Sequence, residues 1–203
     1  MLKREPQQGR SRGMVDDILT AATRVLNSHP LREVTTNHIA DVAGISIGSL
    51  YQYFDSKQAI IGSLLERHQV DSIAQANRIL TECEGNCITS RYRIILRELV
   101  ALHERERGLH LNFLEFDSRG PAVIGAPPAV EHIQLLSQLL CEEFLNLAEQ
   151  ESALHAQVLI RTVHALVHGA IRLPSHDRDQ KVVQYFDAFA SSYHRAIATR
   201  AVG

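Results

Sequence analysis

The apolar residues of this 203-residue chain recur every three to four positions almost from end to end, and this pattern constrains the fold more than any other feature. Such spacing places them on one face of a helix, whereas strands would need strict alternation, which we do not find. The chain is therefore expected to be all-α. The predicted helices cover about residues 15–26, 35–42, 46–53, 55–80, 89–107, 109–116, 129–149, 151–173 and 179–199.

Several residues predict where these helices begin and end. Thr35 or Thr36 can cap the second helix with a side-chain oxygen. Asp55, with Gln58 three residues later, resembles a capping box that opens the fourth helix. Gly108 is expected to interrupt the helical pattern that starts at residue 89, since glycine weakens a helix interior.

The charge balance alone does not single out a nucleic-acid binder. The net charge is -2 at pH 7, from 21 basic and 23 acidic residues. Residues 1–60 hold seven of the basic and six of the acidic side chains. Four of those basic side chains lie within residues 1–13, which are expected to form a basic flexible tail.

Neither a membrane segment, a secretory signal nor a disulfide framework is indicated. No apolar run approaches the roughly 18 residues of a membrane span, and the N-terminus lacks the apolar stretch of a signal peptide. The three cysteines, Cys83, Cys87 and Cys141, are an odd number and are interpreted as reduced thiols, although a redox or metal pair at Cys83 and Cys87 is the alternative. We expect a cytoplasmic protein.

Residues 35–54 carry the most specific pattern in the chain. Two short helices must cross closely around a tight turn, for which Ala40 and Ala43 are small enough and Gly44 can adopt a left-handed conformation. The apolar wedge between them is expected to consist of Ile39, Val42, Ile45, Leu50 and Phe54. The exposed face of the later helix then carries uncharged hydrogen-bonding groups, which suit base edges and phosphate oxygens: Ser46, Ser49, Tyr51, Gln52 and Tyr53.

This segment resembles the TetR family of transcription regulators. The matching elements are Ile18-Leu19-x-x-Ala22, Thr35-Thr36-x-x-Ile39-Ala40, Ala43-Gly44-Ile45-Ser46-x-Gly48-Ser49-Leu50-Tyr51-x-Tyr53-Phe54 and Ser56-Lys57. Pro30, Ser49 and Gln58 depart from the family pattern, in which Gly, Thr and Glu are common. The resemblance covers about residues 14–65. It implies a three-helix helix-turn-helix DNA-binding domain at 14–60 and a helical ligand-binding and dimerisation domain at 61–203.

The resemblance also implies roles for individual residues. Thr36, Tyr51, Tyr53 and Lys57 would contact phosphates. The bases would face Ser46, Ile47, Gly48, Ser49, Asn37 and Gln52, and Thr35 belongs to the same DNA-binding set. The partner would be a near-palindromic double-stranded operator, bound by a homodimer that acts as a repressor rather than an activator.

The body should provide the dimer interface and a ligand pocket. Helix 151–173 is apolar almost all round, and the last helix carries a stripe of Val182, Phe186, Phe189, Ala190, Tyr193 and Ile197. Both are expected to pair with a second subunit, although packing within one subunit is the alternative. The resemblance implies a pocket for a small, mostly apolar organic molecule. Its candidate residues, each of which can equally fill the core, are Tyr92, Leu99, His103, His110, Phe113, Phe116, Leu139 and His164.

Two other functions compete with a ligand-responsive regulator. One is a regulator controlled by a protein partner. The other is a metal-dependent enzyme built on the helical body, for which His164 and His168, four residues apart, have metal-ligand spacing. These histidines are interpreted as core or interface residues, because no catalytic motif accompanies them. We expect no enzyme activity, cofactor or metal.

Overall fold

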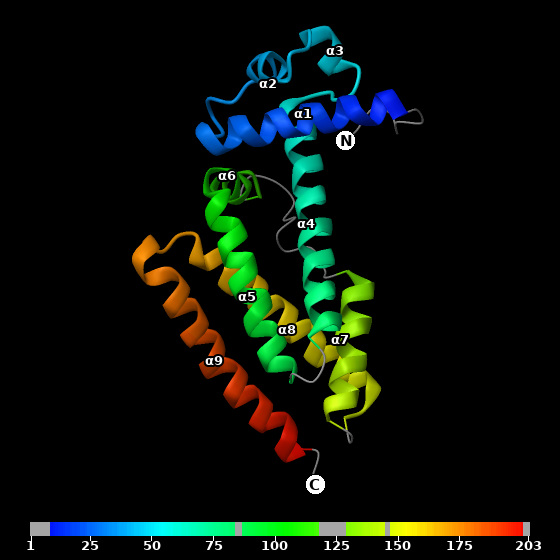
Figure 1. The fold of residues 1–203 in the computed structure, drawn as a ribbon, viewed down its shortest axis with the longest axis vertical. Helices are drawn as coiled ribbons and strands as arrows, with labels where there is room; N and C mark the ends of the chain where they lie inside the picture. Colours follow the sequence, from blue (N-terminus) through cyan, green and yellow to red (C-terminus); the bar gives the residue numbers. More distant parts are fainter. Residues whose placement is uncertain (1–8, 84–86, 118–128, 145–146, 201–203) are drawn as a thin grey trace. The chain divides into compact units, whose positions relative to one another are not determined.

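The computed structural model describes residues 9–83, 87–117, 129–144 and 147–200. Within these residues the chain forms nine helices and no strand (Figure 1): α1 (Gly9–Ser28), α2 (Thr36–Ala43), α3 (Ile47–Tyr51), α4 (Lys57–Glu82), α5 (Ile88–Arg105), α6 (Arg107–Asp117), α7 (Val130–Glu143), α8 (Glu149–Ala170) and α9 (Ser175–Arg200). The predicted all-α class is confirmed. None of the described helices is both long and apolar enough to span a bilayer.

Contacts divide the chain into two compact units. The first combines residues 1–70 with 106–126, so it holds α1, α2, α3, α6 and the first part of α4. The second combines residues 71–105 with 127–203, so it holds the rest of α4 with α5, α7, α8 and α9. The sequence assigned residues 61–203 to the body, yet α6 belongs to the same unit as the predicted head. The domain boundaries at residues 13 and 60 remain predictions.

The first unit is built on the apolar face of α1, against which α2 and α6 pack. Ile18, Ala22 and Leu26 are fully buried there, together with Leu50 and Phe54. Burying a large apolar side chain stabilises a fold by roughly 1.5–3 kcal/mol, so this core holds the short α2 and α3 in place.

Val42 does not belong to the predicted apolar wedge, because its side chain is 41% exposed. α2 uses Ile39 and Ala40 to pack on the core, and both are buried. A residue two positions beyond Ala40 lies about 200° round the helix, on the opposite face. Val42 therefore faces away from the core.

An amide side chain joins α6 to the end of α1. Asn112 is buried and accepts a hydrogen bond from the backbone N–H of Leu31 at 2.8 Å. Its side-chain amide donates to the carbonyl oxygens of Leu26 at 2.7 Å and His29 at 2.9 Å. These bonds satisfy the polar backbone groups where α1 ends, and they explain why α6 is part of the first unit.

Several predicted helix ends were wrong by a few residues. α1 begins at Gly9, so the last residues of the predicted flexible tail are helical, and residues 1–8 lie outside the described residues. The capping residue before α4 is Ser56 rather than Asp55, because the Ser56 hydroxyl accepts a hydrogen bond from the Ala59 N–H at 3.2 Å. The break after α5 falls at Glu106, and Gly108 lies inside α6. The predicted loop at 118–128 lies outside the described residues.

In the second unit, α5 contacts α7, α8 and α9, and α8 contacts α7 and α9. Tyr92 and Leu96 of α5 are buried in its core with Phe186 of α9. Most of the stripe predicted to pair with a second subunit is buried within this unit instead: Val182, Phe186, Ala190 and Ile197. On α9, packing within one chain therefore accounts for these residues.

Candidate nucleic-acid interface

The turn between α2 and α3 has the geometry expected from its glycine. Thr35 caps α2, since its side-chain oxygen accepts a hydrogen bond from the His38 N–H at 3.1 Å. Gly44 ends the helix with a φ of 69°, in the left-handed region that favours glycine. The next N–H, that of Ile45, donates to the Ala40 carbonyl at 3.0 Å, which completes a Schellman motif. Of the two residues predicted to cap this helix, Thr35 is the cap and Thr36 is the first helical residue, and the predicted Gly44 turn is confirmed.

Helix α3 is short and is fixed at its N-terminus by serine. The Ser46 hydroxyl accepts a hydrogen bond from the Ser49 N–H at 3.0 Å and lies 2.9 Å from the Ser49 hydroxyl. Leu50 anchors the helix to the core with no exposed surface. The local hydrogen bonds and this single anchor orient the rest of α3 toward solvent.

The outward face of α3 consists of uncharged groups. Ser46, Ile47, Gly48, Tyr51 and Gln52 are exposed, whereas Ser49 is half-buried. Ile47 is 37% exposed and Tyr51 is 44% exposed. A helix face of this composition matches the needs of a major groove, where base edges offer donors, acceptors and methyl groups.

A hydrogen bond joins the start of α2 to the end of α3. The hydroxyl groups of Thr36 and Tyr51 lie 3.1 Å apart. Thr35 and Asn37, beside Thr36, are exposed. Thr36 and Tyr51, both predicted to contact phosphates, are thus brought together at the N-terminus of α2. The N–H groups of a helix N-terminus also favour anions.

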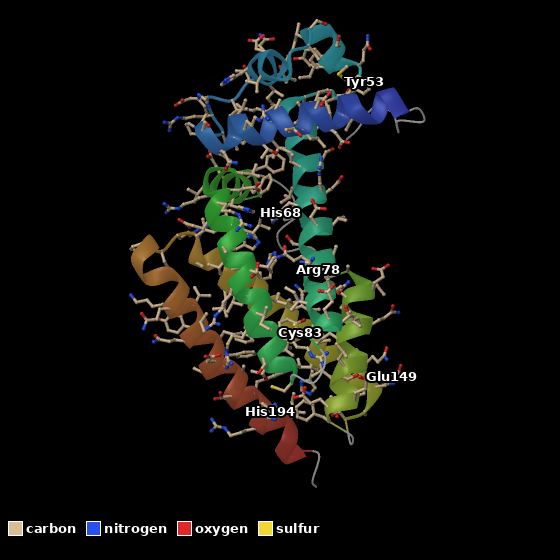
Figure 2. All side chains as sticks on the ribbon, viewed as in Figure 1. Tyr53, His68, Arg78, Cys83, Glu149 and His194 are labelled. Carbon is tan, nitrogen blue, oxygen red and sulfur yellow. The ribbon has the colours of Figure 1, made fainter. Side chains whose placement is uncertain are left out.

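Tyr53 and Lys57 are placed differently from the other predicted contacts. Tyr53, labelled in Figure 2, is half-buried and packs against the core of the first unit. The Lys57 amine donates to the carbonyl oxygens of Leu31 and Val34, each at 2.8 Å. Lys57 therefore stabilises the turn between α1 and α2, a role that the sequence did not indicate.

The eight pocket candidates do not all lie in one unit. His110, Phe113 and Phe116 belong to the first unit, where Phe113 is part of the hydrophobic core. The other candidates belong to the second unit: Tyr92, Leu99, His103, Leu139 and His164. Leu99 and Leu139 pack against its core. The pocket assignment remains a prediction.

A buried polar network in the second unit was missed from the sequence. His132 of α7 is 5% exposed and shares hydrogen bonds with Asn77 of α4 and with the Tyr92 hydroxyl, the latter at 3.4 Å. The Asn77 side-chain oxygen accepts, so the Nδ1 of His132 carries the hydrogen and its Nε2 accepts from Tyr92. Burial lowers the pKa of His132 to about 4 and raises the pKa of Tyr92, which keeps both groups neutral. No sequence spacing links these residues, since they come from three helices.

A small cavity beside this network is lined by residues of α5, α7, α8 and α9. Its volume is about 20 Å³, and its walls include Tyr92, Leu140, Phe144 and Tyr193. A space of this size holds roughly one water molecule. Of the eight predicted pocket residues, Tyr92 lines this cavity.

A helix-turn-helix motif whose second helix is exposed and uncharged has the features expected of a DNA-binding domain. Residues 18–64 match the family model described as bacterial regulatory proteins, tetR family. The predicted resemblance to the TetR family is thereby confirmed for this segment.

Curated relatives resemble one part of the chain. The nucleoid occlusion factor SlmA of Vibrio vulnificus is 33% identical over 95 residues, which is 46% of this chain and 47% of the relative. The SlmA protein of Idiomarina loihiensis is 32% identical over 94 residues, with the same coverage. The chain thus spans about half the length of these curated relatives in the matched region.

Solved structures show the same fold over most of the chain. A TetR-family transcriptional regulator from Pectobacterium atrosepticum covers 91% of this chain and 95% of its own, with a TM-score of 0.71 and 13% identity. FadR from Bacillus subtilis, solved in complex with stearoyl-CoA, covers 84% of this chain and 96% of its own, with a TM-score of 0.58 and 16% identity. At such low identities, these similarities concern the fold.

Proposed function

We propose that this protein is a ligand-responsive, dimeric repressor that binds a near-palindromic DNA operator. The observation that carries the proposal is the exposed, uncharged face of α3, held in a helix-turn-helix by the Gly44 turn. Each subunit would place α3 in a major groove, with half-site centres about 34–36 Å apart. The protein would act in the cytoplasm and would need neither a cofactor nor catalytic residues.

The proposed DNA contacts divide into two kinds. Gly48 on α3 and Gln52 at its C-terminal end would approach base edges, because both are exposed and neither carries a charge. Thr36 and Tyr51 would bind one phosphate together, since their hydroxyl groups are 3.1 Å apart. Lys57 would act mainly by holding the turn between α1 and α2.

The short connection between α5 and α6 supports a route by which a ligand could control DNA binding. α5 of the second unit ends at Arg105, and α6 of the first unit begins at Arg107, so a single residue separates them. A ligand that shifts α5 would therefore act directly on α6, which is bonded through Asn112 to the end of α1. Changing the DNA-competent fraction from about 99% to 1% would require roughly 5.5 kcal/mol of differential affinity.

We infer that the ligand is an organic molecule with a large apolar part. The similarity of fold to FadR, which was solved with stearoyl-CoA, supports this choice, as do the aromatic residues of the middle helices. The alternative is control by a protein partner. Calorimetry of long-chain acyl compounds with and without operator DNA separates the two, because an inducer must bind the free protein more tightly.

The DNA-binding proposal is tested by adding a negative charge to the exposed face of α3. Gln52→Glu should weaken operator binding by at least about tenfold, because a carboxylate would face base edges and phosphates. Gln134→Glu is the matched control, since Gln134 is exposed on α7 of the second unit. If both variants bound the operator with equal affinity in an anisotropy titration, α3 would not be part of the DNA interface.

A further inference from the structure

Gly48 on α3 and Gln52 at its C-terminal end form the outermost face of this helix. Successive residues of an α-helix are about 100° apart, so both residues lie roughly 160° round the helix from Leu50. Leu50 is fully buried, whereas Gly48 and Gln52 are exposed. Gln52 keeps helical geometry, with a φ of -70° and a ψ of -26°. A DNA duplex that approaches α3 from solvent would therefore meet these two residues first.

The other polar side chains of this segment already have partners within the protein. The Ser46 hydroxyl accepts a hydrogen bond from the Ser49 N–H at 3.0 Å and lies 2.9 Å from the Ser49 hydroxyl. The Tyr51 hydroxyl lies 3.1 Å from that of Thr36. Among the described residues, the Gln52 amide has no such partner. Gln52 is therefore the residue of this segment best placed to form hydrogen bonds with a base edge.

The helix-turn-helix lacks the side chains that most often recognise guanine. Residues 35–54 contain neither lysine nor arginine. These two residue types are the commonest partners of guanine, because they donate to its O6 and N7 acceptors. Lys57, which follows the motif, donates instead to the carbonyl oxygens of Leu31 and Val34. The motif is therefore poorly suited to the selection of a G·C pair in the major groove.

A glutamine amide is complementary to adenine in the major groove. Adenine offers an acceptor at N7 beside a donor at its N6 amino group, so one amide can donate to the first and accept from the second. Guanine offers two acceptors, N7 and O6, and the amide oxygen would then face one of them. Gly48 has no side chain, so it allows a base edge to come within reach of Gln52.

We propose that the Gln52 amide binds an adenine, so that the protein selects an A·T base pair at one position of each operator half-site. This inference rests on the proposed function and adds the identity of one base pair to it. Ile47, which is 37% exposed on α3, would contact the methyl group of a neighbouring thymine. A G·C pair in place of the A·T pair should lower the affinity by about tenfold or more.

The experiment is selection of binding sites from random duplex DNA by the full-length wild type and by Gln52→Arg. We expect an A·T pair at one position of each wild-type half-site. Gln52→Arg should select a G·C pair at that position, because arginine donates to both guanine acceptors. Replacement of the adenine by 7-deazaadenine removes its N7 acceptor. It should weaken wild-type binding by about fivefold or more but leave the affinity of Gln52→Ala unchanged.

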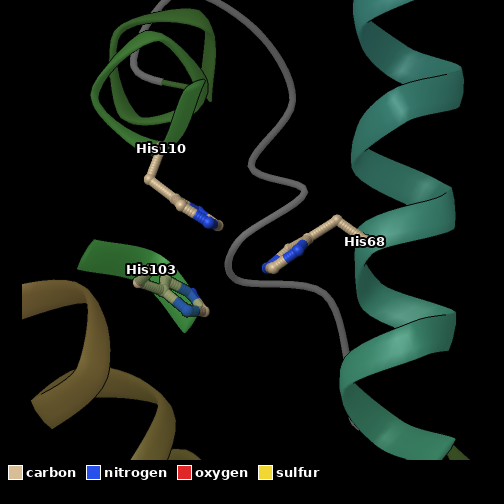
Figure 3. A group of neighbouring side chains, drawn as sticks. All are labelled: His68, His103 and His110. Atoms are coloured by element: carbon tan, nitrogen blue, oxygen red, sulfur yellow. The ribbon is translucent and has the colours of Figure 1, made fainter. Parts of the chain in front are cut away.

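His68→Gln is the control, because His68 belongs to the first unit but packs on α6. Its ring centre lies 4.6 Å from that of His110, and Figure 3 shows His110 directed from α6 toward His68 of α4. The His68 ring also lies 5.9 Å from that of Phe113, which is part of the hydrophobic core. The variant should select the same base pair as the wild type, whatever its affinity for DNA, because it leaves the exposed face of α3 unchanged.

The selections also separate this inference from the proposed function. If the wild type enriched half-sites without a conserved A·T pair, the assignment of adenine to Gln52 would be wrong, although DNA binding would stand. The same conclusion would follow if Gln52→Arg enriched the same sequences as the wild type. If the wild type enriched no sequence at all, the proposed function would fail together with the inference.

Discussion

At the scale of single residues, Lys57 illustrates how a predicted contact can have a different role. Its amine donates to two backbone carbonyls at 2.8 Å, and a charged donor of this kind contributes about 1.5–3 kcal/mol. Lys57→Met should therefore lower the free energy of unfolding of the first unit by roughly that amount, measured by urea denaturation. Gln58→Met, at an exposed neighbouring position, should have little effect. Equal denaturation midpoints for the two variants would mean that the Lys57 hydrogen bonds do not stabilise the fold. A DNA contact would then be the remaining role proposed for Lys57.

The close packing around Gly108 leads to a second prediction at this scale. A Cβ atom at Gly108 would lie 2.2 Å from the Asn27 carbonyl oxygen, a contact with backbone that cannot simply rotate away. Gly108→Ala should destabilise the first unit by about 1–3 kcal/mol. Gly62→Ala is the matched control, because a Cβ there meets nothing within 4 Å and alanine favours a helix by about 0.5–1 kcal/mol. If both variants raised the unfolding temperature, the close packing of α6 on α1 would be wrong.

At the scale of elements, the buried network between α4, α5 and α7 predicts a pH dependence. The pKa of His132 falls from 6.5 to about 4 in the folded protein, so the unfolded chain binds a proton more readily. The stability is therefore complete above about pH 6.5 and is lost as the pH falls toward 4. Between about pH 7 and pH 5 the wild type should lose on the order of 2 kcal/mol through this group.

The His132→Gln variant separates the contribution of His132 to the pH dependence of stability from the contributions of the other histidines. Its free energy of unfolding should depend less on pH over the same range, so the difference between wild type and variant should shrink as the solution is acidified. Urea denaturation at several pH values measures this difference. A constant difference across the range would mean that His132 titrates in the folded protein as it does in the unfolded chain.

The elements also show how much the sequence predicted. The all-α class, the Thr35 cap and the Gly44 turn followed from local chemistry, because each depends on residues within one or two turns. The break at Glu106 did not follow from local chemistry. Gly108 allows the backbone of Asn27, more than 80 residues earlier in the chain, to pack closely against α6. This tertiary contact outweighed the low helix propensity of glycine.

The candidate site was predictable to a similar extent. The exposed residues of α3 follow from helical periodicity around Leu50. The bonds of Lys57 to the turn after α1, and the network of Asn77, Tyr92 and His132, depend on how distant helices pack. Periodicity reports which face of a helix is buried, but not which polar group of another helix it meets.

At the scale of the whole molecule, the proposed dimer predicts the effect of a charge on α8. Leu154 is 61% exposed although its helix is otherwise rich in apolar residues, and Val130 on α7 is 63% exposed. Leu154→Arg should convert dimers to monomers without loss of helicity, since a charge in a packed interface is strongly unfavourable. Val130→Arg should remain dimeric. Sedimentation velocity at micromolar concentration checks both, and a monomeric wild type would contradict the proposed assembly.

The central claim is that the outward face of α3 approaches DNA closely, and Gly48→Ala tests it most directly. A Cβ atom at Gly48 would meet only the Ser46 hydroxyl, at an ordinary 3.7 Å, so the fold should keep or gain stability. The measurement is the operator affinity of Gly48→Ala and Gly62→Ala by fluorescence anisotropy, with wild type as reference. We predict a loss of about tenfold or more for Gly48→Ala and no change for Gly62→Ala. Wild-type affinity in both variants would contradict the account.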